Sequence, residues 1–209
     1  MNEELVAKIS DLQEEDALRL AGNIIKQGGD PNDVLAAARK AMEEVGQRFA
    51  VGDYFIPDLI YSGTILKGIV SIIKPHLKQE EAPKKKGAVI IGTVAGDVHD
   101  IGKDIVVFML DCNGFEVFDL GIDVPKQVFI DKIIETNAKV VGLSGFLTLA
   151  FEAMKETVDA IKEAGLRDEI KIMIGGGQID EKIMNYTGAD AYGNDALDAV
   201  NLARDWLMQ

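Results

Sequence analysis

Ala88-Val89-Ile90-Ile91-Gly92-Thr93-Val94 is a short apolar run, and Gly96-Asp97-Val98-His99-Asp100-Ile101-Gly102-Lys103 follows it almost at once. A short run rich in β-branched residues is typical of a buried strand in a parallel sheet. The second segment places carboxylates, a histidine and glycines just past the strand, at the sheet edge where open parallel sheets bind ligands. The chain has only two histidines, so we interpret His99 as an imidazole that is presented to a ligand.

The sequence downstream of this segment alternates between strand-like and helix-like patterns. Apolar strands are expected at residues 88–94, 115–120, 139–144, 170–175 and 190–193. Helical patterns lie between them, at 102–112, 126–136, 150–164 and 180–187, with a last helix from Leu197. Such alternation predicts a doubly wound, parallel, five-stranded sheet of the Rossmann-like (flavodoxin) type, an α/β domain over residues 88–209.

Residues 1–78 show helical periodicity throughout and predict a four-helix cap bundle. Ser10 or Asp11 is expected to cap a helix that runs to Lys26. Asp30-Pro31 is expected to begin the next helix, with Asp as N-cap and Pro at the first position. A last helix from about Pro57 is apolar over much of its circumference, which is typical of a helix central to a small bundle.

The segment between these halves is charged and contains a proline. We interpret residues 79–87 as an interdomain linker, and the alternative is that Lys84, Lys85 and Lys86 form a basic docking patch. The whole chain of 209 residues is 47% hydrophobic and 27% charged, which indicates a globular protein. Its net charge of −13 argues against nucleic acid as a partner. That charge serves solubility or complements a less acidic partner protein.

The remaining composition indicates a reduced, cytoplasmic protein. Cys112 is the one cysteine and falls in an apolar helical segment, so we expect a buried thiol. No apolar run reaches the ~20 residues of a membrane span, and the acidic start is unlike a signal peptide. We therefore expect neither a membrane partner nor export.

The loops that follow the five expected strands gather at one edge and define a candidate pocket. They are residues 96–103, 121–125, 144–148, 175–178 and 192–196. Ser144 and Thr148 offer hydroxyl groups to a polar ligand, and the run Gly175 to Gly177 would let a ligand approach the backbone closely.

Each of these features also has a purely structural interpretation. Asp97 and Ser144 could cap the helices that follow them, the three glycines could form a tight turn, and His99 could be an ordinary surface histidine. A zinc site is not favoured, because Cys112 and His76 are the other strong nitrogen or sulfur ligands. From the residues alone we infer an α/β ligand-binding domain with one special histidine.

The segment from Gly96 to Val106 resembles the Asp-x-His-x-x-Gly signature of cobalamin-binding domains. The family's later Ser-x-Leu and Gly-Gly elements resemble Ser144-Gly145-Phe146 and Gly175-Gly176. The helical half is similar to the family's cap module in Val45-Gly46-Gln47-Arg48-Phe49 and in the segment from Gly52 to Leu59. The chain is therefore most similar to the corrinoid proteins of anaerobic methyltransferase systems and to the cobalamin-binding region of methionine synthase.

This resemblance implies a role for each residue of the motifs. His99 would be the lower axial ligand of cobalt in a base-off/His-on cofactor, and Asp97 would accept the other imidazole N–H. Gly102 would let the displaced nucleotide tail enter the sheet, and Phe55 of the cap would shield the upper face. The other implied cofactor-binding residues are Gly96, Val98, Asp100, Ile101, Ser144, Phe146, Thr148, Gly175, Gly176, Tyr192 and Ala196.

Two positions depart from the methionine synthase pattern. Phe146 stands where leucine is usual, and Ala150 stands where that enzyme has a serine that completes a proton relay. A relay of that composition is therefore not expected here, whereas the pairing of His99 with Asp97 is.

The resemblance further implies that the chain carries methyl groups and catalyses no reaction by itself. A partner methyltransferase would supply the methyl group to cobalt(I), giving methylcobalamin. A second methyltransferase would pass it to tetrahydrofolate, a related pterin or a thiol, and a reductive activase would restore cobalt(I). The alternatives are the cobalamin-binding subunit of an adenosylcobalamin mutase, or a cobalamin sensor that acts on protein partners.

Overall fold

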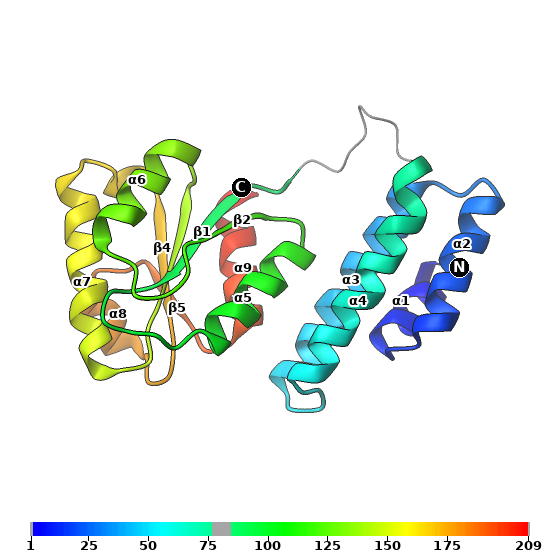
Figure 1. Ribbon diagram of the computed structural model, residues 1–209, viewed down its shortest axis with the longest axis horizontal. Helices are drawn as coiled ribbons and strands as arrows, with labels where there is room; N and C mark the ends of the chain where they lie inside the picture. Colours follow the sequence, from blue (N-terminus) through cyan, green and yellow to red (C-terminus); the bar gives the residue numbers. More distant parts are fainter. Residues whose placement is uncertain (1, 77–84, 209) are drawn as a thin grey trace. The chain divides into compact units, whose positions relative to one another are not determined.

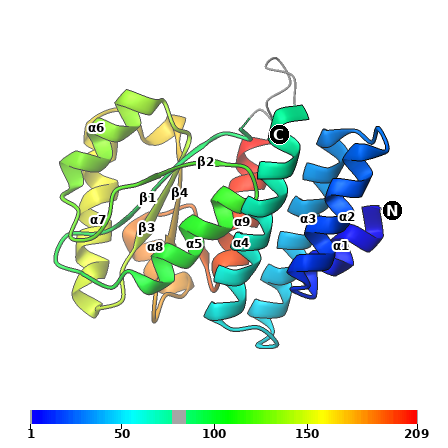
Figure 2. The same cartoon turned by 45° about the vertical axis from the view of Figure 1, so that its right-hand side comes forward.

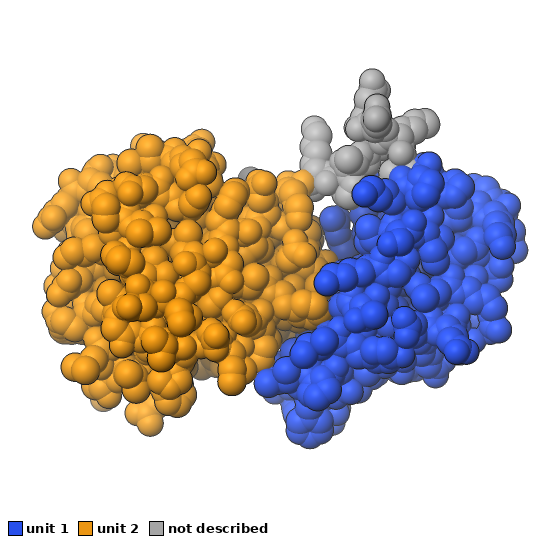
Figure 3. Space-filling view, viewed as in Figure 1, with its two compact units in different colours: residues 1–84 blue, residues 85–209 orange. Residues whose placement is uncertain are grey.

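The computed structural model describes residues 2–76 and 85–208, and the chain divides into two compact units, residues 1–84 and 85–209 (Figure 3). The two units differ in architecture, since the first is helical and the second is built on a sheet. Most of the expected linker, residues 79–87, lies outside the described residues. At its end, the backbone N–H of Lys86 donates to the carbonyl oxygen of Gly114, and Lys85 pairs with Asp111, both in the second unit.

The first unit is a bundle of helices, which confirms the predicted helical cap. Leucine, isoleucine, valine and alanine side chains from each helix meet in one continuous core, which includes Leu5, Ile24, Val34 and Ile69. The helices are α1 (Asn2–Ser10), α2 (Glu14–Lys26), α3 (Pro31–Ala50) and α4 (Ile56–Ile73), followed by a 3₁₀ turn, η1 (Lys74–His76).

One of the two predicted N-caps in this unit is confirmed by the structure, and the other is wrong. Asp30 caps α3, because its carboxylate accepts the backbone N–H of Asn32 at 2.8 Å. The predicted cap at Ser10 or Asp11 is wrong, since Ser10 ends α1 and α2 begins after Gln13, with no side-chain cap. Leu12 at φ 58° makes the tight turn between the two helices, so the predicted helix begins a few residues later than expected.

Helix α4 is the most apolar helix of the bundle. Together with η1 it is long and apolar enough, by length and composition alone, to cross a membrane. One side of α4 nevertheless packs against α2 and α3, burying Leu59, Ile65, Ile69 and Ile73. That arrangement is typical of the core helix of a bundle.

The second unit is a doubly wound α/β fold, as the alternating pattern predicts (Figure 1). Its described strands form one parallel sheet in the order β2-β1-β3-β4-β5, which is the flavodoxin-type order. The strands are β1 (Ala88–Thr93), β2 (Glu116–Asp119), β3 (Val140–Ser144), β4 (Lys171–Gly175) and β5 (Ala191–Gly193). The connecting elements are α5 (Ile101–Cys112), α6 (Lys126–Thr136), α7 (Thr148–Glu163), η3 (Arg167–Glu169), α8 (Glu181–Thr187) and α9 (Ala196–Leu207).

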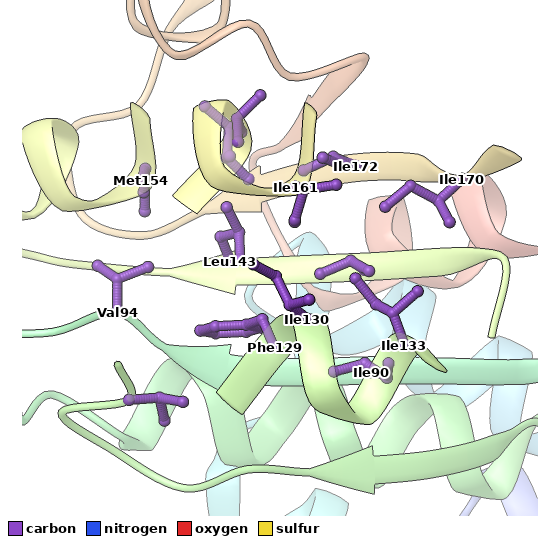
Figure 4. Packing of buried hydrophobic residues seen from close by; sticks show 14 of the residues in the cluster. Ile90, Val94, Phe129, Ile130, Ile133, Leu143, Met154, Ile161, Ile170 and Ile172 are labelled. Atoms are coloured by element: carbon purple, nitrogen blue, oxygen red, sulfur yellow. The ribbon is translucent and has the colours of Figure 1, made fainter. Parts of the chain in front are cut away.

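Helices cover both faces of this sheet. Helix α5 packs beside α9 on one face, while α6, α7 and α8 follow one another across the other (Figures 1 and 2). Ile90 of β1 and Leu143 of β3 meet Phe129 of α6 and Met154 of α7 in a buried core (Figure 4). Cys112 at the end of α5 is buried. This rigid frame fixes the loops at the carboxyl ends of the strands.

Candidate functional site

The carboxyl ends of four strands lie in register at one edge of the sheet. Thr93 of β1 pairs with Ser144 of β3, Ser144 pairs with Gly175 of β4, and Gly175 pairs with Gly193 of β5. The chain order reverses between β1 and β3, because β1 continues to β2 on one side and β3 continues to β4 on the other. Open α/β sheets bind ligands at such a switch point, and the loops after β1 and β3 flank it here.

The loop after β1 is held in shape by a left-handed glycine and by hydrogen bonds with Asp123. Gly96 adopts φ +81°, a left-handed conformation that glycine takes at little cost. Its N–H donates to the carboxylate of Asp123 at 2.7 Å, and the N–H of Asp123 donates to the carbonyl oxygen of Asp97 at 3.0 Å. The loop after β2 therefore supports the loop that carries His99.

The carboxylate of Asp97 connects the two loops that flank the switch point. Its side chain is fully buried. Oδ1 accepts the backbone N–H of His99 at 2.9 Å and lies 2.7 Å from Nδ1 of the His99 imidazole. Oδ2 accepts the backbone N–H groups of Phe146 and Leu147, at 2.7 and 3.0 Å. One carboxylate thus fixes the imidazole and the backbone of the loop after β3.

These hydrogen bonds also determine the charge of Asp97. Burial by itself raises the pKa of this carboxyl, but the N–H groups of Leu147, His99 and Phe146 and the imidazole of His99 together hold the pKa well below its usual range. Asp97 is therefore ionised at neutral pH. An anionic partner at Nδ1 places the proton of a neutral imidazole on that nitrogen and leaves the lone pair on Nε2.

His99 is left with one nitrogen for a ligand. Nδ1 is occupied by Asp97, and among the described residues no hydrogen bond to Nε2 is formed. The imidazole is half-exposed, with 48% of the side chain accessible to solvent, and Thr93 Oγ1 donates to the carbonyl oxygen of His99 at 3.1 Å. A fixed backbone, a fixed tautomer and a free Nε2 are what a metal-ligating histidine needs.

The glycines around the site differ in what an added side chain would meet. Gly176 has φ +146°, and a Cβ there would lie 1.7 Å from the carbonyl oxygen of Gly145, so the two backbones touch. By contrast, a Cβ on Gly175 would meet no atom closer than 3.9 Å, and one on Gly102 would meet nothing within 4 Å. Gly176 is therefore required by the fold, whereas Gly175 and Gly102 border open space.

The structure brings Asp97, His99 and Phe146 into direct contact, and the other predicted residues of the α/β unit lie along the same edge of the sheet. Val98 of the first loop and Ile101, the first residue of α5, are exposed apolar side chains, and Asp100 is the residue before α5. Ser144 ends β3, Thr148 begins α7, Tyr192 lies in β5 and Ala196 begins α9. Phe55 belongs to the helical unit, where it precedes α4 and is 66% exposed.

Two of the purely structural interpretations are wrong. Asp97 does not cap α5, because the residue before that helix is Asp100 and no side chain caps it. Ser144 does not cap α7, because Leu147 occupies the N-cap position. The carboxylate of Asp97 is therefore used for the histidine and the neighbouring loop.

A buried ion pair next to the motif was not predicted. Lys103 is 4% exposed, and its Nζ lies 2.7 Å from both carboxylate oxygens of Asp119 and 2.7 Å from Asp104. Burial lowers the pKa of Lys103, but the hydrogen bonds with Asp104 and Asp119 outweigh it and raise the pKa above its ordinary value. A charged Lys103 thus ties the first turn of α5 to the end of β2.

The polar residues of the cap motif have a structural role within the helical unit. The hydroxyl of Tyr54 donates to the carbonyl oxygen of Ser10 at 2.6 Å, and Arg48 donates to the same oxygen at 2.7 Å. These bonds fasten the end of α1 to the loop between α3 and α4. They leave the apolar side chains of that loop, Val51 and Phe55, exposed.

Comparison with known proteins assigns both units. Family models described as B12 binding domains match residues 87–201 and residues 1–74. Trimethylamine corrinoid protein 1 of Methanosarcina acetivorans is 36% identical over 99% of this chain and 98% of its own length. The trimethylamine corrinoid protein of Methanosarcina barkeri is 38% identical over 95% of this chain and 94% of its own.

Two solved structures have the same fold. A crystal structure of a cobalamin-binding protein from Desulfitobacterium hafniense matches with a TM-score of 0.84 and 39% identity, over 99% of this chain and 98% of that one. The methanol:cobalamin methyltransferase complex MtaBC of Methanosarcina barkeri matches with a TM-score of 0.80 and 28% identity, over 98% of this chain and 78% of that one.

The helical unit and the α/β unit each match a B12 binding domain, so this chain is in the class of B12-binding proteins. This chain belongs to the family of corrinoid proteins within that class. The described residues contain no cluster of three or more His, Cys, Asp or Glu side chains that could hold a metal ion. They fit a corrinoid nonetheless, because a corrin ring brings most of the ligands of its own cobalt, and the half-exposed imidazole of His99 offers one further nitrogen, Nε2.

Proposed function

We propose that this chain is the methyl-carrying corrinoid subunit of a methyltransferase system, with His99 as the lower axial ligand. When bound, the corrinoid cobalt supplies the nucleophile that takes up a methyl group and gives it to an acceptor. The observation that carries the proposal is the 2.7 Å contact between His99 Nδ1 and the buried carboxylate of Asp97, which leaves Nε2 for the cobalt.

The residues of this chain would bind and orient the cofactor. Asp97 holds the proton on Nδ1, so that the lone pair of Nε2 is available. Val98 and Ile101, on either side of the histidine in the chain, are 62 and 68% exposed, and Leu149 of α7 is 82% exposed. All three would offer apolar contact to the ring. The nucleotide tail would pass Gly102 and Gly175, where the structure leaves space for it. Ser144, Thr148, Tyr192 and Ala196 would line its path.

Asp97→Asn is expected to leave a folded protein whose histidine has the wrong tautomer. The asparagine oxygen can accept the N–H groups of Phe146 and Leu147, and its NH₂ then faces His99 and donates to Nδ1. The imidazole proton moves to Nε2, which can no longer ligate cobalt. The backbone N–H of His99 then faces the asparagine NH₂ group and loses its hydrogen-bond acceptor. This loss lowers the unfolding free energy by about 1–3 kcal/mol. Absorption spectra of the cobalamin-loaded protein and thermal unfolding measure both effects.

The control for this variant is Asp205→Asn, because Asp205 is exposed near the end of α9 and lies outside the loops assigned to the cofactor. This control should keep the His-on spectrum and the wild-type melting temperature. A wild-type His-on spectrum in Asp97→Asn would contradict the proposed role of the carboxylate.

Gly102→Ala is expected to stabilise the fold and at the same time to weaken cobalamin binding. An added methyl group meets nothing within 4 Å and sits in the first turn of α5, so the unfolding free energy should rise by up to about 1 kcal/mol. The same methyl group would obstruct the nucleotide tail and should weaken cobalamin binding about tenfold. Gly22→Ala is the matched control, since Gly22 lies within α2 with nothing within 4 Å. Equal cobalamin affinity in both variants would show that the tail does not pass Gly102.

The partners follow from the same proposal. The names of the relatives mention trimethylamine and methanol, and the MtaBC title describes a methyltransferase complex. We infer that a partner methyltransferase selects the methyl donor, while this chain contributes the cofactor. An acceptor methyltransferase, with tetrahydrofolate, a related pterin or a thiol as acceptor, and a reductive activase complete the cycle. We expect all of them in the cytoplasm.

Reconstitution with methylcobalamin and adenosylcobalamin in parallel tests the proposal. A methyl carrier should bind methylcobalamin tightly and give it a His-on absorption spectrum. Preference for adenosylcobalamin would instead indicate a mutase subunit or a sensor, and failure to bind either form would refute the function.

A further inference from the structure

The ring of Phe146 lies against the imidazole of His99. The two ring centroids are 4.7 Å apart and the planes are tilted by 31°, within the range of favourable aromatic pairs. Phe146 is 55% exposed, so burial in a core does not explain where its ring sits. The contact joins the loop after β1 to the loop after β3, across the switch point of the sheet.

The backbones of both residues are fixed by one carboxylate. Asp97 accepts the N–H of His99 through Oδ1 and the N–H of Phe146 through Oδ2, at 2.9 and 2.7 Å. The hydrogen bond from His99 Nδ1 to Asp97 holds one edge of the imidazole. A single bond at one edge still lets a half-exposed ring rock about it, and a second contact on the ring face restricts that motion.

The Phe146 ring occupies the space that a side chain at Gly177 would need. A Cβ on Gly177 would lie 2.5 Å from two atoms of the Phe146 ring, Cδ2 and Cε2. No left-handed φ is found at Gly177, unlike at Gly176, so its backbone would accept alanine. What excludes a side chain at Gly177 is therefore the ring of Phe146.

We propose that Phe146 is a positioning residue for His99, and that Gly177 provides the space that keeps its ring against the imidazole. The inference rests on the proposed function, because it assigns the contact to the presentation of the cobalt ligand. An imidazole held at its edge by Asp97 and on its face by Phe146 loses little further freedom when Nε2 binds cobalt. The His-on state is thereby favoured.

A different role for the same ring is that of a passive wall of the tail channel. The two roles differ in what happens before any cofactor is present. A positioning residue orders the imidazole in the apo protein, and a passive wall does not. They also differ at Gly177, where an added methyl group displaces the ring and leaves Phe146 itself intact.

The apo protein provides the first readout, by nuclear magnetic resonance of the imidazole protons. The chain has two histidines, and His76 lies in the helical unit, so it serves as an internal reference. The ring current of Phe146 should shift the His99 signals in the wild type. That shift should disappear in Phe146→Leu, persist in Phe146→Tyr, and be reduced in Gly177→Ala.

The cobalamin-loaded protein provides the second readout, the ratio of His-on to His-off absorption. We expect Phe146→Leu to lower this ratio about three- to tenfold and Phe146→Tyr to restore it. Gly177→Ala should resemble Phe146→Leu, and the double variant should be no worse than either single one, because both act through one contact.

Each outcome decides the inference. Additive effects of the two substitutions, or a wild-type His-on ratio in Phe146→Leu, would overturn it. A missing ring-current shift in the apo wild type would overturn it as well. If the shift is present but the wild type binds no cobalamin, the proposed function fails and the assignment to a cobalt ligand falls with it, while the contact itself stands.

Discussion

His99→Ala is expected to bind cobalamin and to lose the His-on spectrum completely. The nucleotide tail would be held by the loops after β3 and β4, whose own residues the substitution leaves unchanged. The axial nitrogen, however, belongs to the imidazole alone. Alanine removes Nε2 and also removes one hydrogen bond to Asp97, whose carboxylate keeps its bonds to the N–H groups of Phe146 and Leu147. Absorption spectroscopy of the loaded variant measures the change.

The second histidine of the chain provides the control for this experiment. His76→Ala alters the 3₁₀ turn after α4, and it should leave the His-on spectrum as it is in the wild type. If His99→Ala kept that spectrum as well, another group would have to ligate the cobalt, and the assignment of the axial ligand would be wrong.

Gly176→Ala is expected to lower the unfolding free energy by about 3 kcal/mol or more, which is enough to threaten folding of the α/β unit. Two costs add at this position. Alanine at φ +146° is strained, and its Cβ would lie 1.7 Å from the carbonyl oxygen of Gly145, a backbone atom that no side-chain movement can relieve. Thermal and denaturant unfolding of the apo protein measure the loss.

Gly175→Ala separates this structural effect from cofactor binding. The nearest atom to a Cβ on Gly175 is 3.9 Å away, so the apo protein should keep its stability. If the tail passes this residue, the variant should bind cobalamin more weakly than the wild type. Equal stability of Gly176→Ala and Gly175→Ala would contradict the close approach of the two loops.

The strands and the edge of the site were predictable because each depends on local sequence. Short β-branched runs alternate with helical patterns at regular intervals, and the carboxyl ends of parallel strands must share one edge. Asp97 and His99 stand directly after the first run. The position of His99 in the site therefore follows from the sequence.

The contacts across loops were not predictable from the sequence, because they depend on the register of strands far apart in the chain. Phe146 reaches His99 only because Ser144 pairs with Thr93. A lysine in the first turn of a helix is usually exposed. Lys103 is buried because its ammonium group pairs with Asp119 at the end of β2. Neither pairing leaves a signal in a single sequence.

In the helical unit, local signals were informative at one turn and misleading at another. Asp30-Pro31 combines an N-cap with a proline at the first helical position, and α3 begins there. Ser10 and Asp11 are good capping residues as well, but the turn at Leu12 shifts the start of α2 beyond them. The carbonyl oxygen of Ser10 is instead used by Tyr54 and Arg48, which no local pattern indicates.

Electron paramagnetic resonance of the cobalt(II) form tests the central claim most directly. The protein is produced once with ordinary histidine and once with histidine that carries the heavy nitrogen isotope, and both are loaded with cobalamin. If His99 Nε2 ligates the cobalt, the nitrogen splitting of the cobalt signal will change with the isotope in the protein. If the splitting is the same in both samples, the axial nitrogen does not come from a histidine of this chain.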